Sequence, residues 1–123
     1  MAKILVVDDS KFMRLTLKNL LEKNFGGIHS VIGEAGSADE AVEKFLQLRP
    51  DLITMDIIMP GESGLEAVKK IMSHSPTVKI IMVSAMGQEK IVEEAIALGA
   101  KSFVVKPVKT EDLIKTVEKV LGI

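Results

Sequence analysis

The sequence predicts an α/β domain whose parallel β-sheet is covered by helices on both faces. Five short runs of aliphatic and β-branched residues alternate with five longer stretches of helical period, as expected for repeated βα units. Several of the short runs are continuously apolar, which is typical of strands buried on both faces. A length of 123 residues suits one domain and leaves no room for two. The pattern runs from Lys3 to Leu121, so we expect no appended domain.

The five expected strands differ in how strongly the sequence marks them. In chain order they are residues 4–7, 31–32, 52–55, 80–83 and 103–105. The first, third and fourth are the most continuously apolar and are expected at the centre of the sheet. The second is short and has Glu34 and His29 close to it, so it is interpreted as an edge strand.

Between the strands, apolar residues recur three or four positions apart, which is the period of a helix with one buried face. The apolar faces are Met13, Leu17, Leu20 and Leu21; Ala38, Ala41, Val42, Phe45 and Leu46; Leu65, Val68, Ile71 and Met72; and Leu113, Ile114, Val117, Val120 and Leu121. A further helix is expected over roughly residues 88–98, ending at Gly99 as a left-handed C-cap.

Capping residues predict where three of these helices begin. Ser37 with Glu40, and Ser63 with Glu66, have the spacing of a capping box, in which two side chains satisfy free backbone N–H groups. Thr110 is expected to cap the last helix.

Composition and charge exclude several classes of function. With 47% hydrophobic and 27% charged residues, the chain is typical of a soluble globular protein. Its 16 basic and 17 acidic residues give a net charge of -1, so neither nucleic acid nor a membrane surface is an expected partner. The absence of cysteine excludes disulfides, thiolate metal sites and a cysteine nucleophile. No apolar run suits a membrane span or a signal peptide, so a cytoplasmic protein is expected.

Polar side chains follow four of the five expected strands. Asp8 and Asp9 follow the first, Asp56 the third, Ser84 the fourth and Lys106 the fifth. Because the carboxyl ends of parallel strands meet at one edge of a sheet, we expect these five side chains to converge there. Taken singly, each is more often a solvated turn, cap or surface residue, so only their conjunction indicates a site.

The combination of these residue types indicates metal-assisted phosphoryl chemistry. Three carboxylates held together repel one another and need a cation or raised pKa values. Oxygen ligands without cysteine or histidine suit a hard cation such as Mg²⁺. A lysine and a hydroxyl beside the metal are what a phosphoryl group with three charged oxygens requires. The two histidines, His29 and His74, lie far apart and are expected to be solvated and without a role.

The sequence also resembles the receiver domains of two-component response regulators, of the stand-alone CheY-like type. The matching segments are residues 6–10, 55–61, 64, 83–85, 99–100 and 105–107, which read VVDDS, MDIIMPG, G, VSA, GA and VKP. The resemblance implies that residues 1–123 form one receiver domain. It also implies a single doubly wound (βα)5 fold, flavodoxin-like or CheY-like, with a five-stranded parallel sheet in the order 2-1-3-4-5.

The resemblance implies a role for each residue of the expected site. Asp56 would accept a phosphoryl group from the phosphohistidine of a histidine kinase. Asp9, Asp56 and the backbone carbonyl of Ile58 would bind Mg²⁺, and Asp8 would hold a coordinated water. Lys106 would pair with the phosphoryl oxygens.

Two residues would carry the switch. Ser84 would move to donate a hydrogen bond to a phosphoryl oxygen, and Phe103 resembles the family's switch aromatic. Chemotaxis members often carry tyrosine there, whereas this chain has no tyrosine, so the ring can be buried but cannot donate a hydrogen bond to a partner. The alternative is a core phenylalanine of an edge strand. The output face would include Lys90, Glu94, Lys101, Ser102, Phe103 and Lys109.

Two apolar residues are expected to control how long the phosphorylated state lasts. Ile58 and Met86 lie two positions after Asp56 and Ser84, and receiver domains resemble one another in using these positions to tune lifetime. Large apolar side chains there would crowd the path of the attacking water, so we expect slow self-hydrolysis and an auxiliary phosphatase. The alternative is that both residues only cover the rim of the sheet.

The leading interpretation is a monomeric, phosphorylation-controlled switch that is not an enzyme beyond its own phosphoryl acceptance and slow autodephosphorylation. Its phosphodonor would be a histidine kinase, and its target a flagellar motor switch protein, by analogy with chemotaxis receivers. A phosphorelay intermediate, a phosphate sink and a pseudo-receiver that only docks partners remain alternatives. A Mg²⁺-dependent phosphohydrolase uses similar parts, but commonly carries Asp-x-Asp after the first strand, whereas Asp8 and Asp9 are adjacent.

Overall fold

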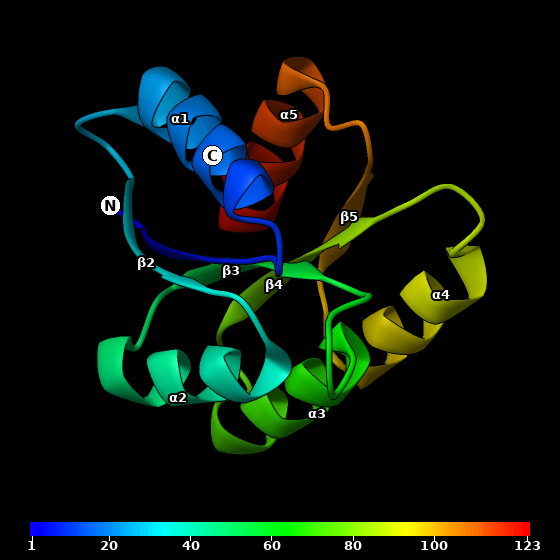
Figure 1. The fold of residues 1–123 in the computed structure, drawn as a ribbon. Helices are drawn as coiled ribbons and strands as arrows, with labels where there is room; N and C mark the ends of the chain where they lie inside the picture. The colour runs from blue at the N-terminus through cyan, green and yellow to red at the C-terminus, as the bar shows by residue number, and fades with distance from the viewer.

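Five strands and five helices alternate along the chain, and the computed structural model describes all of residues 1–123 (Figure 1). The strands are β1 (Lys3–Val7), β2 (Ser30–Ala35), β3 (Leu52–Asp56), β4 (Lys79–Ser84) and β5 (Ser102–Val105). The helices are α1 (Lys11–Phe25), α2 (Ala38–Leu48), α3 (Gly64–His74), α4 (Glu89–Leu98) and α5 (Thr110–Leu121). Every expected element is present, and β2 is longer than predicted because Gly33, Glu34 and Ala35 also pair with β1.

The strands form one parallel sheet in the order β2-β1-β3-β4-β5. Helices α1 and α5 cover one face of it, and α2, α3 and α4 cover the other (Figure 1). The predicted doubly wound fold and the edge position of β2 are therefore confirmed. Because all strands run the same way, the loops that follow β1, β3, β4 and β5 meet at one edge of the sheet. None of the helices combines the length and the apolarity that a membrane crossing requires.

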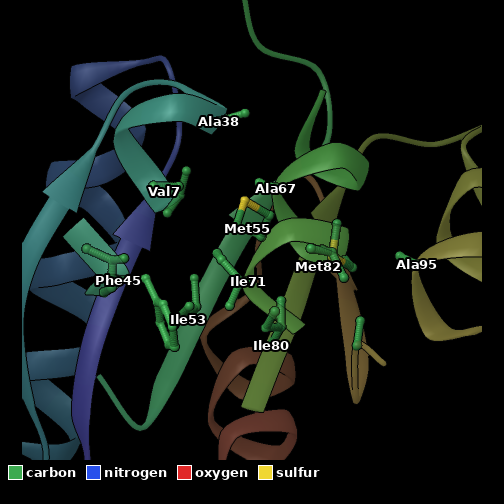
Figure 2. Packing of buried hydrophobic residues seen from close by; sticks show 14 of the residues in the cluster. Val7, Ala38, Phe45, Ile53, Met55, Ala67, Ile71, Ile80, Met82 and Ala95 are labelled. Atoms are coloured by element: carbon green, nitrogen blue, oxygen red, sulfur yellow. The ribbon is translucent and has the colours of Figure 1, made fainter. Parts of the chain in front are cut away.

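The central strands are continuously apolar because each of their faces is covered by a separate core. Successive side chains of a strand point to opposite faces. In β1, Leu5 and Val7 belong to the larger cluster of 19 buried residues, whereas Ile4 and Val6 belong to the cluster of 11 on the other face. Figure 2 shows members of the larger cluster, with Val7, Ile53, Met55, Ile80 and Met82 of the strands near Phe45, Ala67 and Ile71 of the helices.

The predicted cap is confirmed at α2, is confirmed in position but not in its side-chain hydrogen bond at α3, and is wrong at α5. At α2, the Ser37 hydroxyl accepts from the Glu40 N–H over 3.1 Å. At α3, Ser63 occupies the N-cap but its side chain makes no capping hydrogen bond, because its backbone carbonyl already accepts from the Glu66 N–H. At α5, Thr110 is the first helical residue rather than the cap. The carbonyl of Lys109 accepts the first helical hydrogen bond, so the helix starts one residue earlier than predicted.

The prediction that His29 is solvated is wrong, because its side chain is buried. Its Nδ1 accepts from the Ala2 N–H over 2.9 Å, and its ring lies 5.3 Å from that of Phe25. The imidazole thus holds the start of β1 at the edge of the sheet opposite the predicted site. His74 is exposed, as expected.

Replacing Thr54 by valine is expected to stabilise the fold by about 1 kcal/mol, since a buried polar group without a partner is costly. Thr54 is fully buried in β3, and its hydroxyl has no hydrogen-bond partner. Valine keeps the shape and removes the hydroxyl. Denaturant unfolding measures the change. The control is Thr116→Val, which removes a hydroxyl that donates to the Asp112 carbonyl and should bring no gain. A Thr54→Val protein no more stable than wild type would contradict this account.

Candidate functional site

The carboxyl edge of the sheet gathers the five polar residues that follow its strands. Asp56 and Ser84 are the last residues of β3 and β4, while Asp8, Asp9 and Lys106 lie just beyond β1 and β5. Carboxylate oxygens of the three aspartates lie within 4.8 Å of one another. The structure therefore brings together side chains that are up to 98 positions apart in the chain.

Asp8 is fully buried, and its surroundings leave one oxygen without a hydrogen-bond partner. The Ser10 N–H donates to Oδ1 over 2.9 Å, and the backbone N–H of Asp8 donates to the Ala35 carbonyl over 3.0 Å. Oδ2 makes no hydrogen bond and lies 3.2 Å from the Lys106 ammonium, its one ion-pair partner. A buried carboxylate oxygen without a hydrogen bond favours the binding of a cation beside it.

Asp56 is buried beside Asp8 and is correspondingly hard to ionise. Its Oδ1 accepts from the Ile57 N–H over 2.9 Å and from the Lys106 ammonium over 3.3 Å. Burial first, and then the charge of Asp8, raise the pKa of Asp56 to about 6, although Lys106 and the Ile57 hydrogen bond act in the opposite direction. Metal-free Asp56 is therefore partly protonated near neutral pH.

Lys106 lies between two carboxylates, within 3.3 Å of each. Burial lowers the pKa of its ammonium, but the charges of Asp56 and Asp8 outweigh this effect and raise that pKa above its ordinary value. The lysine is consequently a fixed positive charge at the mouth of the site.

The contribution of Asp56 to the stability of the metal-free protein is expected to fall as pH rises from 4 to 7. The raised pKa of Asp56 means that the folded state holds a proton more tightly than the unfolded chain. This contribution is fully favourable below pH 4 and is lost as pH rises through about 6. Two pKa units correspond to at most about 3 kcal/mol, so we expect a loss of roughly 1–3 kcal/mol.

Urea unfolding in EDTA between pH 4 and 8 measures this loss, and Asp56→Asn isolates the group responsible. The asparagine variant should match wild type near pH 4 and exceed its stability at pH 7.5. Parallel curves for the two proteins across this range would show that Asp56 is not the source.

The donor set at this edge fits a hard divalent cation. Three carboxylates lie close together with no sulfur or imidazole among them, and Asp8 Oδ2 makes no hydrogen bond and has the Lys106 ammonium, 3.2 Å away, as its one partner. Oxygen donors of this kind are the ligands that Mg²⁺ prefers. The charge of Lys106 only partly offsets the three negative charges, so a cation would relieve the remaining repulsion.

Ser84 and Phe103 lie on the β4–β5 side of the site. The Ser84 hydroxyl is buried and donates a long hydrogen bond of 3.5 Å to the Val104 carbonyl. The Phe103 side chain is 46% exposed and lines two cavities. The larger, of about 440 Å³, is also lined by Ser84, Met86 and Val92. Phe103 is therefore not a core residue here, and space for its ring exists next to Ser84.

Ile58 and Met86 are exposed by 67% and 81% and lie on the loops that follow β3 and β4. Neither packs into a core cluster. Their side chains are thus accessible at the same edge as the aspartates, where substitution should cost little stability.

Sequence reasoning misses two residues that shape the site. Arg14 on α1 donates from Nη1 to the Asp8 carbonyl over 2.7 Å, but a helical arginine carries no sequence signal for such a contact. Gly64, the first residue of α3, approaches Asp56 so closely that a Cβ would overlap the Asp56 carbonyl oxygen. Gly64 belongs to the segments that resemble a known family, yet sequence spacing does not show what it touches.

Known proteins match this chain, in sequence and in fold, over nearly its whole length. Residues 4–118 match the response regulator receiver domain family. The chemotaxis protein CheY of Thermotoga maritima is 47% identical over 118 residues, covering 96% of each chain, and Protein CcdB of Bacillus subtilis is 43% identical over 122 residues, covering 99% of each. The CheX–CheY–BeF3–Mg²⁺ complex of Borrelia burgdorferi contains a chain with a TM-score of 0.90 at 31% identity, covering 97% of this chain and 88% of that one.

These matches include every strand of the sheet and the acidic edge at which they end. The relatives found by sequence and the structures found by fold both include CheY proteins. The chain therefore belongs to the response regulator receiver domains, the phosphoprotein modules of two-component signalling.

Proposed function

We propose that this receiver domain is a phosphorylation-controlled switch in which Asp56 accepts a phosphoryl group from the phosphohistidine of a histidine kinase. The observation that carries the proposal is the placement of Asp56 among two carboxylates and one lysine, within 3.3 Å of the Lys106 ammonium. An Asp56 oxygen forms the bond to phosphorus as the bond from phosphorus to the histidine nitrogen breaks. The leaving imidazole keeps the electron pair.

The other residues of the site stabilise the charge that this transfer brings in. Asp9, Asp56 and the backbone carbonyl of Ile58 would hold Mg²⁺, and Asp8 would hold a water of the ion. When bound, Mg²⁺ neutralises phosphoryl oxygens and orients the group for in-line transfer. Lys106, already poised between Asp8 and Asp56, neutralises a further phosphoryl oxygen.

Ser84 and Phe103 carry the signal from the site to the output face. Once a phosphoryl oxygen is present, the Ser84 hydroxyl exchanges its long bond to Val104 for a stronger charge-assisted one. This movement opens the adjoining cavity to the Phe103 ring. The output face is then that of α4, β5 and α5, where Lys90, Glu94, Lys101 and Lys109 are exposed.

The relatives favour chemotaxis as the setting. Chemotaxis proteins CheY are among the relatives that match over nearly their full length, at 44–47% identity. A flagellar motor switch protein is therefore the proposed target, with phosphorelay and phosphate-sink roles as alternatives. The Borrelia burgdorferi CheY is described in complex with CheX, which supports a second protein, such as an auxiliary phosphatase, acting at the same domain. The unit that switches is residues 1–123, acting as a monomer.

Incubation with acetyl phosphate and Mg²⁺, followed by mass spectrometry, tests the proposal. A phosphoryl adduct is expected on wild type, and it should be absent from Asp56→Asn and in EDTA. Steady turnover of an added phosphoester would instead identify a phosphohydrolase, and no reaction at all would identify a docking module. A pull-down with beryllofluoride-loaded protein then separates a motor protein from a relay partner as the target.

The double variant Ile58→Asn with Met86→Glu is expected to dephosphorylate about ten times faster than wild type. Both side chains are exposed at the rim, so polar replacements can orient the attacking water without disturbing the core. A tenfold gain requires only ~1.4 kcal/mol of barrier. The decay of the Asp56 acyl phosphate, measured for each single variant and the pair, gives the rates. A double variant that dephosphorylates no faster than wild type would show that both residues only cover the rim of the site.

A further inference from the structure

The main chain around Asp8 and Asp9 is held from several sides, and one of the contacts comes from α1. The backbone N–H of Asp8 donates to the Ala35 carbonyl, and its Oδ1 accepts from the Ser10 N–H. The carbonyl oxygen of Asp8 accepts from Arg14 Nη1 over 2.7 Å. The main chain of Asp8 is thus fixed at both of its polar groups.

Asp9 depends on this arrangement more than Asp8 does. Its side chain is exposed and makes no hydrogen bond or ion pair of its own. The Asp8 carbonyl belongs to the planar peptide unit that ends at the Cα of Asp9. Arg14 holds that oxygen and so fixes the peptide plane before Asp9, while the Ser10 N–H bonded to Asp8 Oδ1 holds the plane after it. The two planes together set the direction in which the Asp9 side chain leaves the backbone.

The guanidinium of Arg14 is itself braced. Its Nε donates to Glu34 Oε1 over 3.0 Å, and Glu34 lies on the edge strand β2 opposite Val6 of β1. The Arg14 side chain is only 19% exposed. Gly36 leaves room for the guanidinium, since a Cβ there would lie 3.3 Å from Nη1. One side chain therefore joins α1, β2 and the loop that carries Asp8 and Asp9.

We infer that Arg14 is a positioning residue for the divalent-cation site, acting through the Asp8–Asp9 peptide, and that Glu34 orients Arg14. The inference rests on the proposed Mg²⁺-dependent function. Arg14 forms no ion pair with Asp8, Asp9 or Asp56, so it is neither a ligand nor a counter-charge in contact with one.

Two effects of Arg14 on Mg²⁺ oppose each other, and this makes the inference testable. Its positive charge repels a cation bound nearby, so removing the charge alone would tighten Mg²⁺ binding. Its hydrogen bond orders the Asp9 ligand, so removing that bond would weaken Mg²⁺ binding. Charge repulsion is screened by salt, whereas the loss of positioning is not.

Calorimetric titration with MgCl2 should show about tenfold weaker binding by Arg14→Met than by wild type, at both low and high salt, as found when outer contacts of metal ligands are lost. Arg14→Lys keeps the charge but cannot reach both Asp8 and Glu34, so its affinity should be intermediate. Glu34→Ala should weaken binding about threefold. Asp9→Ala serves as the reference for the affinity that is lost when a proposed ligand is removed. Arg49→Met, which removes the same charge at the opposite edge of the sheet, should bind Mg²⁺ as wild type does.

An NMR spectrum of the metal-free protein adds a readout that a general loss of stability would not produce. In Arg14→Met the Asp9 amide resonance should shift or broaden while the resonances of α3 and α5 stay in place. Unchanged or tighter Mg²⁺ binding by Arg14→Met would overturn the inference and leave the proposed function standing. If Arg14→Met does not fold, wild-type affinity in both Arg14→Lys and Glu34→Ala overturns it equally. Failure of wild type itself to bind Mg²⁺ would overturn the proposed function and this inference together.

Discussion

Replacing Lys106 by methionine is expected to lower the stability of the metal-free protein by about 2–3 kcal/mol at pH 8. Lys106 is the one cation within 3.3 Å of both Asp8 and Asp56, and removing one partner of a largely buried ion pair leaves the other charge uncompensated. The loss should be much smaller at pH 5, because Asp56, whose pKa is about 6, is then mostly protonated. Urea unfolding in EDTA at the two pH values measures both effects.

Mg²⁺ should restore more stability to Lys106→Met than to wild type, because the metal takes over the neutralisation of the carboxylates. The matched control is Lys69→Met, which removes an exposed lysine of α3 and should change little at either pH. If Lys106→Met loses as much stability at pH 5 as at pH 8, the lysine acts through packing and not through its charge.

The same variant also tests the switch. Asp56 should still accept a phosphoryl group in Lys106→Met, but phosphorylation should no longer increase target binding, since the group that draws β5 toward the phosphoryl oxygens is gone. Ser84→Ala, at the end of β4, should likewise weaken the dependence of target binding on phosphorylation. Wild-type coupling in either variant would contradict the proposed path.

Replacing Gly64 by alanine is expected to destabilise the fold by roughly 3 kcal/mol and to weaken Mg²⁺ binding strongly. The new Cβ would overlap the backbone carbonyl of Asp56, which cannot move aside as a flexible side chain could. The Gly64 N–H also donates to the Ile57 carbonyl over 2.7 Å, so a displaced α3 would pull the loop that follows Asp56. Thermal unfolding and MgCl2 titration give the two readouts.

Gly61→Ala provides the comparison within the same loop. Gly61 has a φ of +82° and open space where a Cβ would stand, so alanine there meets backbone strain of about 1 kcal/mol without a clash. Gly64→Ala should therefore cost clearly more than Gly61→Ala. Equal costs would mean that α3 can withdraw from Asp56 freely.

Short-range patterns in the sequence were sufficient to place the strands and helices and to indicate the fold class. Alternation of apolar runs with helical periods placed all five strands and all five helices, and the weak marking of residues 31–32 correctly indicated an edge strand. These patterns work because side-chain direction repeats every 2 residues in a strand and every 3.6 in a helix. The strand order followed from the family resemblance, and the fold confirms it.

The patterns failed where a neighbouring backbone group competed with a side chain. Ser63 and Thr110 have the residue types of helix caps, but backbone carbonyls at Ser63 and Lys109 accept the hydrogen bonds in question. His29 looked like a solvated loop residue, yet the Ala2 N–H reaches its Nδ1 from 27 positions away. Local composition does not record such partners.

The sequence by itself determined which chemical groups stand at the ends of the strands, and hence that carboxylates, a hydroxyl and a lysine meet at one edge. Only the tertiary structure decided their state: Asp8 Oδ2 buried without a hydrogen bond, Asp56 with a pKa near 6, and Lys106 shared between them. It alone also brought Arg14 to the Asp8 carbonyl and Gly64 against Asp56. The reason is that burial and charge coupling depend on distances of a few ångströms between residues far apart in the chain, which register and packing set and local periodicity does not.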